Sequence, residues 1–271
     1  MAGNLVGSRP VWPFTGIYIL ARGQQGDDPG ELTSTQNQIA ETLAREWLGR
    51  VAGRATKDRT RVAGARELAY LSGQMGAEQG GGAIARSAIG GLSRVSWFAP
   101  HGMGFAERFV NRALAQVSRY LSDDTIRSAA IDCVLRLVGP ETRVLIGHSL
   151  GSVVAYEAAH RIRQPLQLLL TLGSPLGLQT IVYQRLRPQP PGFPPAVRRW
   201  INVADRDDFI AAEADLTGFF GVGKPPSSVF EGGYTVDNGA EPHNSDFYLG
   251  KAQVGRPVRE AFVSESTPDF A

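Results

Sequence analysis

The sequence is poor in the residue types that bind metals and form cross-links. Among its 271 residues there are one cysteine, Cys133, and four histidines. A single thiol excludes a framework of intrachain disulfides. So small a supply of thiol and imidazole ligands also argues against a zinc site, and we expect no bound metal.

Charge and long apolar runs are also scarce. The formal net charge is +2, which is too small to predict binding to nucleic acid or to an anionic membrane. No run of about eighteen apolar residues occurs, so no membrane-spanning helix is expected. The apolar stretch at 11–20 contains Pro13, follows a single basic residue, Arg9, and lacks a small-residue cleavage pattern. We interpret it as leading into a first strand at 17–20, not as a signal peptide, and expect a cytoplasmic protein.

A strand, a turn and a helix are predicted around Ser149. Residues 144–146 are a short aliphatic run typical of a buried parallel strand, and an alanine-rich run typical of a helix begins after the turn. Between them, residues 147–151 have the sequence GHSLG, a G-x-S-x-G pattern. Chance produces such a pattern about 0.2 times in a chain of this length and composition. The pattern is informative because a predicted strand precedes it and a predicted helix follows it, which is the context of a nucleophile elbow.

Each residue type in this turn has a chemical reason. A nucleophilic serine needs a tight turn that holds its Oγ clear of the backbone, and Gly147 and Gly151 have no Cβ to obstruct the approach of strand and helix. The helix N-terminus adds partial positive charge where an oxyanion would form. The N–H of Leu150 is the expected oxyanion donor. The alternative is an ordinary glycine-rich turn in which Ser149 only caps the helix.

A second oxyanion donor is expected after the first strand. Residues 21–26 contain a glycine turn, and a hydrolase of this type supplies another backbone N–H at this place. Gln24 is the candidate, and a plain loop is the alternative.

Three further strands are predicted at 166–172, 200–204 and 229–236, and they deliver candidates for an acid and a base. His243 is the only histidine downstream of the candidate acids, so it is the candidate base; a surface-loop histidine is the alternative. The order Ser, Asp, His along the chain is that of α/β-hydrolases. The residues alone leave the choice of acid open among four aspartates: Asp205, Asp207, Asp208 and Asp237.

Two other histidines are given different roles. His148 precedes the candidate nucleophile and is expected to point elsewhere, because the turn is sharp. His160 is expected to stabilise the C-terminal end of the helix that follows Ser149.

Helices are predicted from apolar spacing at 34–50, 105–121, 124–137, 209–220 and 254–262. In the first, Ile39, Leu43 and Trp47 share a face that we expect to pack on the sheet. Residues 51–103 are dominated by Gly, Ala and Ser and are predicted to be an insertion, either a lid over the site or a loosely structured helical excursion. The chain 1–271 is otherwise predicted to be one domain.

These motifs together resemble bacterial α/β-hydrolase-fold proteins of the lipase and esterase type, some of which are labelled serine peptidases. The resemblance covers about 17–20 and 123–249 and is carried by residues 147–156, 171–177, 200–211 and 242–249. In lipase-like members the acid begins a turn after an asparagine-containing strand, which implies Asp208, with Asp205 as runner-up. Two positions depart from the family: Arg22 stands where many members have histidine, and Phe209 replaces the usual proline.

We therefore expect an α/β-hydrolase fold, with a mostly parallel sheet flanked by helices and a helical insertion. The resemblance implies that Ser149, His243 and Asp208 cleave a carboxylic ester, a small-molecule or acyl-ester substrate, through an acyl-enzyme and without a cofactor. An acyltransferase or thioesterase, or a peptidase or amidase, would use the same triad. A catalytically silent interaction module is the alternative of another class, and the intact triad residues argue against it. The sequence leaves the oligomeric state open.

Overall fold

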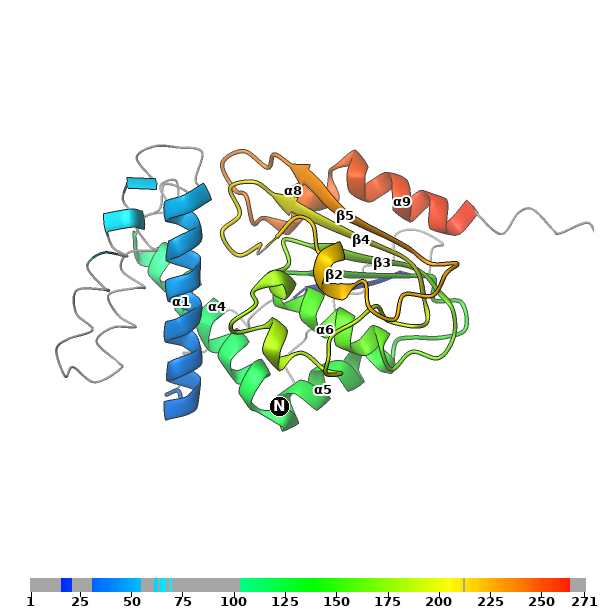
Figure 1. The fold of residues 1–271 in the computed structure, drawn as a ribbon, viewed down its shortest axis with the longest axis horizontal. Helices are drawn as coiled ribbons and strands as arrows, with labels where there is room; N and C mark the ends of the chain where they lie inside the picture. The colour runs from blue at the N-terminus through cyan, green and yellow to red at the C-terminus, as the bar shows by residue number, and fades with distance from the viewer. Residues whose placement is uncertain are drawn as a thin grey trace, which may run out of the picture.

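One parallel sheet forms the centre of the computed structural model, which describes residues 16–20, 31–54, 61–62, 64–66, 69, 103–211 and 213–263, with only the backbone of 16–20 and 103–107. In the described part of the chain this sheet has five strands in the order β1-β2-β3-β4-β5 (Figure 1). Their bounds are Gly16–Leu20, Val144–His148, Leu166–Leu172, Val197–Asp205 and Val229–Val236. All four neighbouring pairs are parallel, so every strand ends at the same edge of the sheet.

Both faces of the sheet are covered at its centre, which is why β2 and β3 are mainly apolar and buried. Figure 1 shows α5 (Asp124–Leu135) and α6 (Leu150–Ala159) on one side and α9 (Ala252–Val263) on the other. In β3, Leu169 belongs to the core cluster on the α6 side, whereas Leu168 and Leu170 belong to the cluster on the α9 side. The central strands therefore bury alternate side chains against different helices.

Two long helices pack against each other beside the loops that leave the sheet. These are α1 (Ser34–Arg54) and α4 (Met103–Ser122). The face of Ile39, Leu43 and Trp47 is buried, as predicted. The principal partner of α1 among the described elements is α4, not a strand, which corrects the expectation that this face packs on the sheet. Trp47 also contacts Phe209, in the loop after β4, with ring centroids 5.7 Å apart.

The predicted helix at 209–220 is wrong except for its last turn, α7 (Thr217–Phe220). Side chains form hydrogen bonds with the backbone N–H and C=O groups that would otherwise pair within a helix. The side chain of Asp208 accepts hydrogen bonds from the N–H groups of Ile210 and Ala211. The Nδ2 of Asn202 donates to the carbonyls of Glu213 and Ala214. These local bonds hold an irregular loop in place.

The remaining short elements are α8 (Ser245–Leu249) and two 3₁₀ turns, η3 (Pro175–Gly177) and η4 (Tyr183–Arg185). Most of the predicted insertion at 51–103 lies outside the described residues. No helix in the described ranges is both long and apolar enough to span a membrane.

Candidate active site

The strand, turn and helix predicted around Ser149 are present as β2, the turn at Ser149 and α6. Ser149 has φ 55° and ψ −132°, and it is the only residue other than glycine with a positive φ among those described. A Cβ on Gly147 would lie 2.5 Å from the carbonyl oxygen of Gly151 and 2.6 Å from the Cα of Ser152. The strand and helix therefore approach so closely that position 147 requires glycine.

The hydroxyl of Ser149 does not cap the helix that it precedes. By contrast, Asp123 caps α5 by accepting hydrogen bonds from the N–H groups of Thr125 and Ile126. Ser149 makes no such side-chain bond and is half-buried. The capping hydrogen bond on which the alternative depends is therefore absent. A strained backbone that carries a side chain without a capping hydrogen bond is a feature of functional positions.

The candidate acid and base are in direct contact. Nδ1 of His243 lies 2.7 Å from Oδ2 of Asp208, and both side chains are buried. The other carboxylate oxygen, Oδ1, accepts hydrogen bonds from the N–H groups of Ile210 and Ala211 at 3.0 and 3.2 Å. Because a carboxylate can only accept, Nδ1 of His243 carries the proton in the neutral ring, and Nε2 is the nitrogen able to accept one.

Asp205, the runner-up, has a different role. Its carboxylate accepts hydrogen bonds from the N–H groups of Asp207 and Asn238. The Nδ2 of Asn238 then donates to the carbonyl of Pro242, at 2.9 Å, directly before His243. Burial raises the pKa of Asp205, and these hydrogen bonds oppose that rise. Asp205 thus supports the loop that carries His243.

The other two candidate acids do not contact His243 through their side chains in any bond described. Asp237 is exposed and forms an ion pair with Arg206. Asp207 is half-buried. Of the four aspartates, only Asp208 is hydrogen-bonded to the candidate base.

Ser149 lies beside this pair, although its hydroxyl is not hydrogen-bonded to His243 among the described residues. The N–H of Ser149 donates to the carbonyl of Leu172 at 3.0 Å. The next residue, Gly173, touches the pair, because a Cβ there would lie 2.9 Å from Oδ2 of Asp208 and 3.1 Å from Nδ1 of His243. Catalytic hydrogen bonds are often long or poorly aligned without substrate and tighten in the complex with substrate.

His148 contacts the candidate base, contrary to the expectation that it points elsewhere. Its ring centroid lies 4.6 Å from that of His243 and 5.8 Å from that of Tyr248. Burial lowers the pKa of His148 well below its ordinary value, and His243 lowers it further. His148 is therefore a neutral ring packed between the nucleophile turn and the base.

Tyr248 and Phe109 were not singled out by sequence reasoning as site residues. Tyr248, fully buried, donates a hydrogen bond to Oδ2 of Asp208 at 2.9 Å. Phe109 of α4 has its ring centroid 6.5 Å from that of His243 in a T-shaped contact. For Tyr248 the sequence offered the Tyr-Leu pair after His243, and for Phe109 it offered the apolar stripe of the helix at 105–121. Neither pattern specifies a contact with the acid or the base.

A buried ion pair holds α6, the helix of the nucleophile turn, against its neighbours. Nε of Arg127 lies 3.6 Å from Oε2 of Glu157, and both side chains are buried. Tyr120 donates to Oε2 of Glu157 at 2.6 Å, and the N–H of Arg187 donates to Oε1 at 2.9 Å. Burial raises the pKa of Glu157, and these three partners lower it. The network joins α4, α5 and α6 to the loop before β4.

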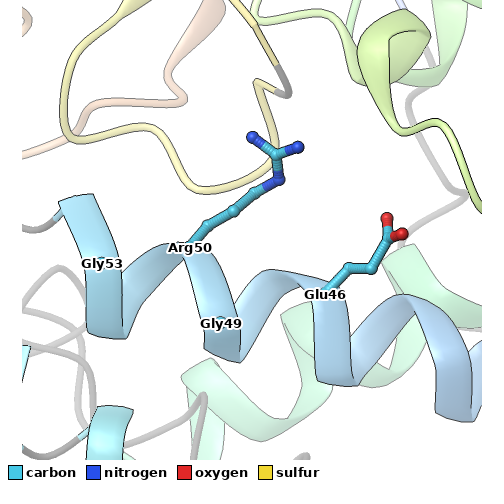
Figure 2. Close-up of a pocket in the computed structure, with 4 residues that line it drawn as sticks. All are labelled: Glu46, Gly49, Arg50 and Gly53. Carbon is cyan, nitrogen blue, oxygen red and sulfur yellow. The ribbon is translucent and has the colours of Figure 1, made fainter.

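A hollow of about 450 Å³ lies beside α1 and is lined by Glu46, Gly49, Arg50 and Gly53 (Figure 2). A Cβ on either glycine would meet nothing within 4 Å. Nη1 of Arg50 lies 3.8 Å from Oε1 of Glu213, in the loop after β4. Burial raises the pKa of Glu46, while Arg50 lowers it. The hollow is open to solvent, and its described lining comes from one face of α1.

Two further predictions concern residues around the turn. Leu150 is the first residue of α6, so its N–H lies at a helix N-terminus, as an oxyanion donor requires. Gln24 lies outside the described residues, and its role stays a prediction.

His160 is the C-cap of α6, but burial lowers its pKa. Its ring is neutral at pH 7, which removes the charge on which the predicted helix-end stabilisation depends.

Comparisons with protein-family models, curated protein sequences and solved structures give no match to this chain. Function therefore has to be argued from the site. The described residues contain no group of three or more His, Cys, Asp or Glu side chains arranged to hold a metal ion.

Proposed function

We propose that the protein is a serine hydrolase of the α/β-hydrolase fold that cleaves a carboxylic ester through an acyl-enzyme. The observation that carries this proposal is the buried Asp208–His243 hydrogen bond, 2.7 Å long, beside a serine in a strained and uncapped turn. An imidazole oriented by a carboxylate next to such a serine is the arrangement that activates a hydroxyl nucleophile.

The three candidate residues follow three different strands of one parallel sheet. Ser149 follows β2, Asp208 follows β4 and His243 follows β5. In sheets of this kind, ligands bind beyond the carboxyl ends of the strands. The chain order Ser, Asp, His with a strand–turn–helix at the serine supports the α/β-hydrolase fold over other folds that carry a triad.

The mechanism assigns one task to each group. Oγ of Ser149 attacks the ester carbonyl carbon, and Nε2 of His243 takes the hydroxyl proton. Asp208 holds Nδ1–H and stabilises the imidazolium that results. The N–H of Leu150 donates to the developing oxyanion. His243 then gives its proton to the leaving alkoxide, and a water activated by the same nitrogen releases the acid.

A silent interaction module is the weaker reading of these residues. A non-glycine residue with positive φ costs of the order of 1 kcal/mol or more. At Ser149 no side-chain hydrogen bond within the described chain offsets that cost. Strain of this kind is understandable when the hydroxyl has a chemical task.

Labelling with a fluorophosphonate probe, together with hydrolysis of p-nitrophenyl acetate and butyrate, tests the proposal. Wild type should be labelled and active, whereas Ser149→Ala should not be labelled and should lose about 10⁶-fold in turnover. His243→Ala should lose a similar factor. Ser128→Ala, a change on α5 away from the site, is the matched control and should behave as wild type. A folded wild type that neither reacts with the probe nor hydrolyses either ester would contradict the proposal.

A further inference from the structure

The hydroxyl of Tyr248 lies between Asp205, the last residue of β4, and Asp208, in the loop after β4. Its oxygen is 2.9 Å from Oδ2 of Asp208 and 2.7 Å from the backbone nitrogen of Asp205. Tyr248 belongs to α8, which begins two residues after His243. The same tyrosine therefore connects the helix after the base to the loop that carries the acid.

The direction of both hydrogen bonds is fixed. The N–H of Asp205 can only donate, so it occupies a lone pair of the tyrosine oxygen. The single hydroxyl proton must then point to Oδ2 of Asp208. Burial raises the pKa of Tyr248 well above its ordinary value, and the neighbouring Asp208 carboxylate raises it further. The hydroxyl is therefore a permanent neutral donor.

The tyrosine and the histidine share one oxygen. Oδ2 of Asp208 accepts from Tyr248 and also faces Nδ1 of His243 at 2.7 Å. A donor on a carboxylate oxygen draws negative charge away from it and weakens its attraction for a neighbouring cation. The tyrosine proton thus opposes part of the pull that Asp208 exerts on an imidazolium.

We propose that Tyr248 is a positioning residue which, through Oδ2 of Asp208, sets both the orientation and the proton affinity of His243. This inference rests on the proposed function, because it gives His243 the role of base. It concerns a residue that contacts the acid and packs near the base without touching the reacting atoms.

Among the described residues, the other groups that pack around His243 do not supply this effect. From β2, His148 is held neutral by burial. From α4, the contact is the uncharged ring of Phe109. From the loop after β4 the charge is Asp208, and from the end of β4, behind Tyr248, it is Asp205. On its own loop, Glu241 is bonded to the side-chain amide of Asn244.

Replacing Tyr248 by phenylalanine should change the pH profile in a defined direction. Without the hydroxyl proton, Oδ2 of Asp208 attracts the imidazolium of His243 more strongly, so His243 loses its proton only at higher pH. The acid limb of the kcat/KM profile should therefore move to higher pH. At the optimum, kcat should fall about tenfold, which corresponds to about 1.4 kcal/mol, while KM stays unchanged.

The matched control is Tyr183→Phe, which removes a hydroxyl that donates to the carbonyl of Phe219 at 2.9 Å, away from the acid and base. A loss of stability alone would affect both variants and would not move the pH limb. If Tyr248→Phe and Tyr183→Phe have the same pH profile as wild type, the inference is overturned. If the wild type is not labelled at Ser149 by the fluorophosphonate probe, the proposed function fails first.

A second variant covers the case in which Tyr248→Phe does not fold. Site-specific 3-fluorotyrosine at position 248 keeps the ring and both hydrogen bonds but makes the hydroxyl a stronger donor. The acid limb should then move to lower pH, opposite to the phenylalanine variant. An unshifted limb in this variant would also overturn the inference.

Discussion

A Cβ atom on Gly173 would lie 3.1 Å from Nδ1 of His243, and it would lie 2.9 Å from Oδ2 of Asp208. Gly173 has φ +52°, and its own N–H donates to the carbonyl of Val203 in β4. The end of β3 therefore forms the surface on which the acid and base meet. Only a residue without a side chain fits there.

Gly173→Ala should lose activity out of proportion to its loss of stability. The positive φ costs about 1 kcal/mol in an alanine, and the new methyl group must displace the Asp208–His243 pair. Misplacement of such groups by about 1 Å costs of the order of 100-fold in rate. Ester hydrolysis and urea unfolding measure the two effects. Gly223→Ala is the control, since it has φ +74° with nothing within 4 Å; equal activity of the two variants would refute the account.

The two buried aspartates should respond differently to amidation. Asp208→Asn should lower kcat by about 10⁴-fold, because the amide no longer holds the correct tautomer of His243. Asp205→Asn removes one acceptor from the loop that carries His243, so it should lower the free energy of unfolding by about 1 kcal/mol and affect kcat far less. Steady-state kinetics with thermal unfolding separate the two. The assignment is wrong if Asp205→Asn is the more damaging to kcat.

Backbone strain at Ser149 can be measured directly. Ser149→Ala and Ser149→Gly both remove the proposed nucleophile, but only glycine accepts φ 55° without strain. The glycine variant should exceed the alanine variant in free energy of unfolding by about 1 kcal/mol. At Ser128, inside α5, the order should reverse, because alanine is the better helix former. Equal stabilities of the two Ser149 variants would show that the turn stores no strain.

Glu46 should make stability depend on pH. Burial raises its pKa in the folded protein, more than Arg50 and the Thr180 backbone lower it. A carboxyl with a raised folded pKa stabilises the protein below its unfolded pKa, and this contribution is lost as the pH rises above about 4.5. The Tm of Glu46→Gln minus the Tm of wild type should therefore increase as the pH rises from about 4 to about 7. Glu141→Gln, at an exposed site, should show no such trend. A constant difference between Glu46→Gln and wild type would contradict the prediction.

Local patterns predict the elements that the chain builds from local information. The strand at 166–172 has the bounds expected, because a run of apolar residues ends on both sides at turn-forming residues. The strand at 229–236 is likewise confirmed. The turn at Ser149 is predictable because glycine spacing, strand and helix are adjacent in the sequence.

Contacts between distant segments are not predictable in this way. The loop after Asp208 was expected to be helical. Nothing in its own sequence shows that Asn202, in β4, donates hydrogen bonds to its carbonyl groups. The contact of His148 with His243 joins positions 95 residues apart (243 − 148), and only the sheet brings them together. The choice of Asp208 came from the family resemblance, and its hydrogen bond to His243 is a fact of the three-dimensional structure.

The two oxygens of Asp208 have different partners, and this affects what the presence of the aspartate in a related protein would indicate. Oδ2 faces His243, but Oδ1 secures the backbone of Ile210 and Ala211. If the proposed function is correct, a descendant that had lost it would still use the aspartate to hold the loop after β4. Retention of this acid in another lineage is therefore poor evidence of activity. Retention of Ser149 is more informative, because its hydroxyl makes no capping hydrogen bond that would preserve a serine there.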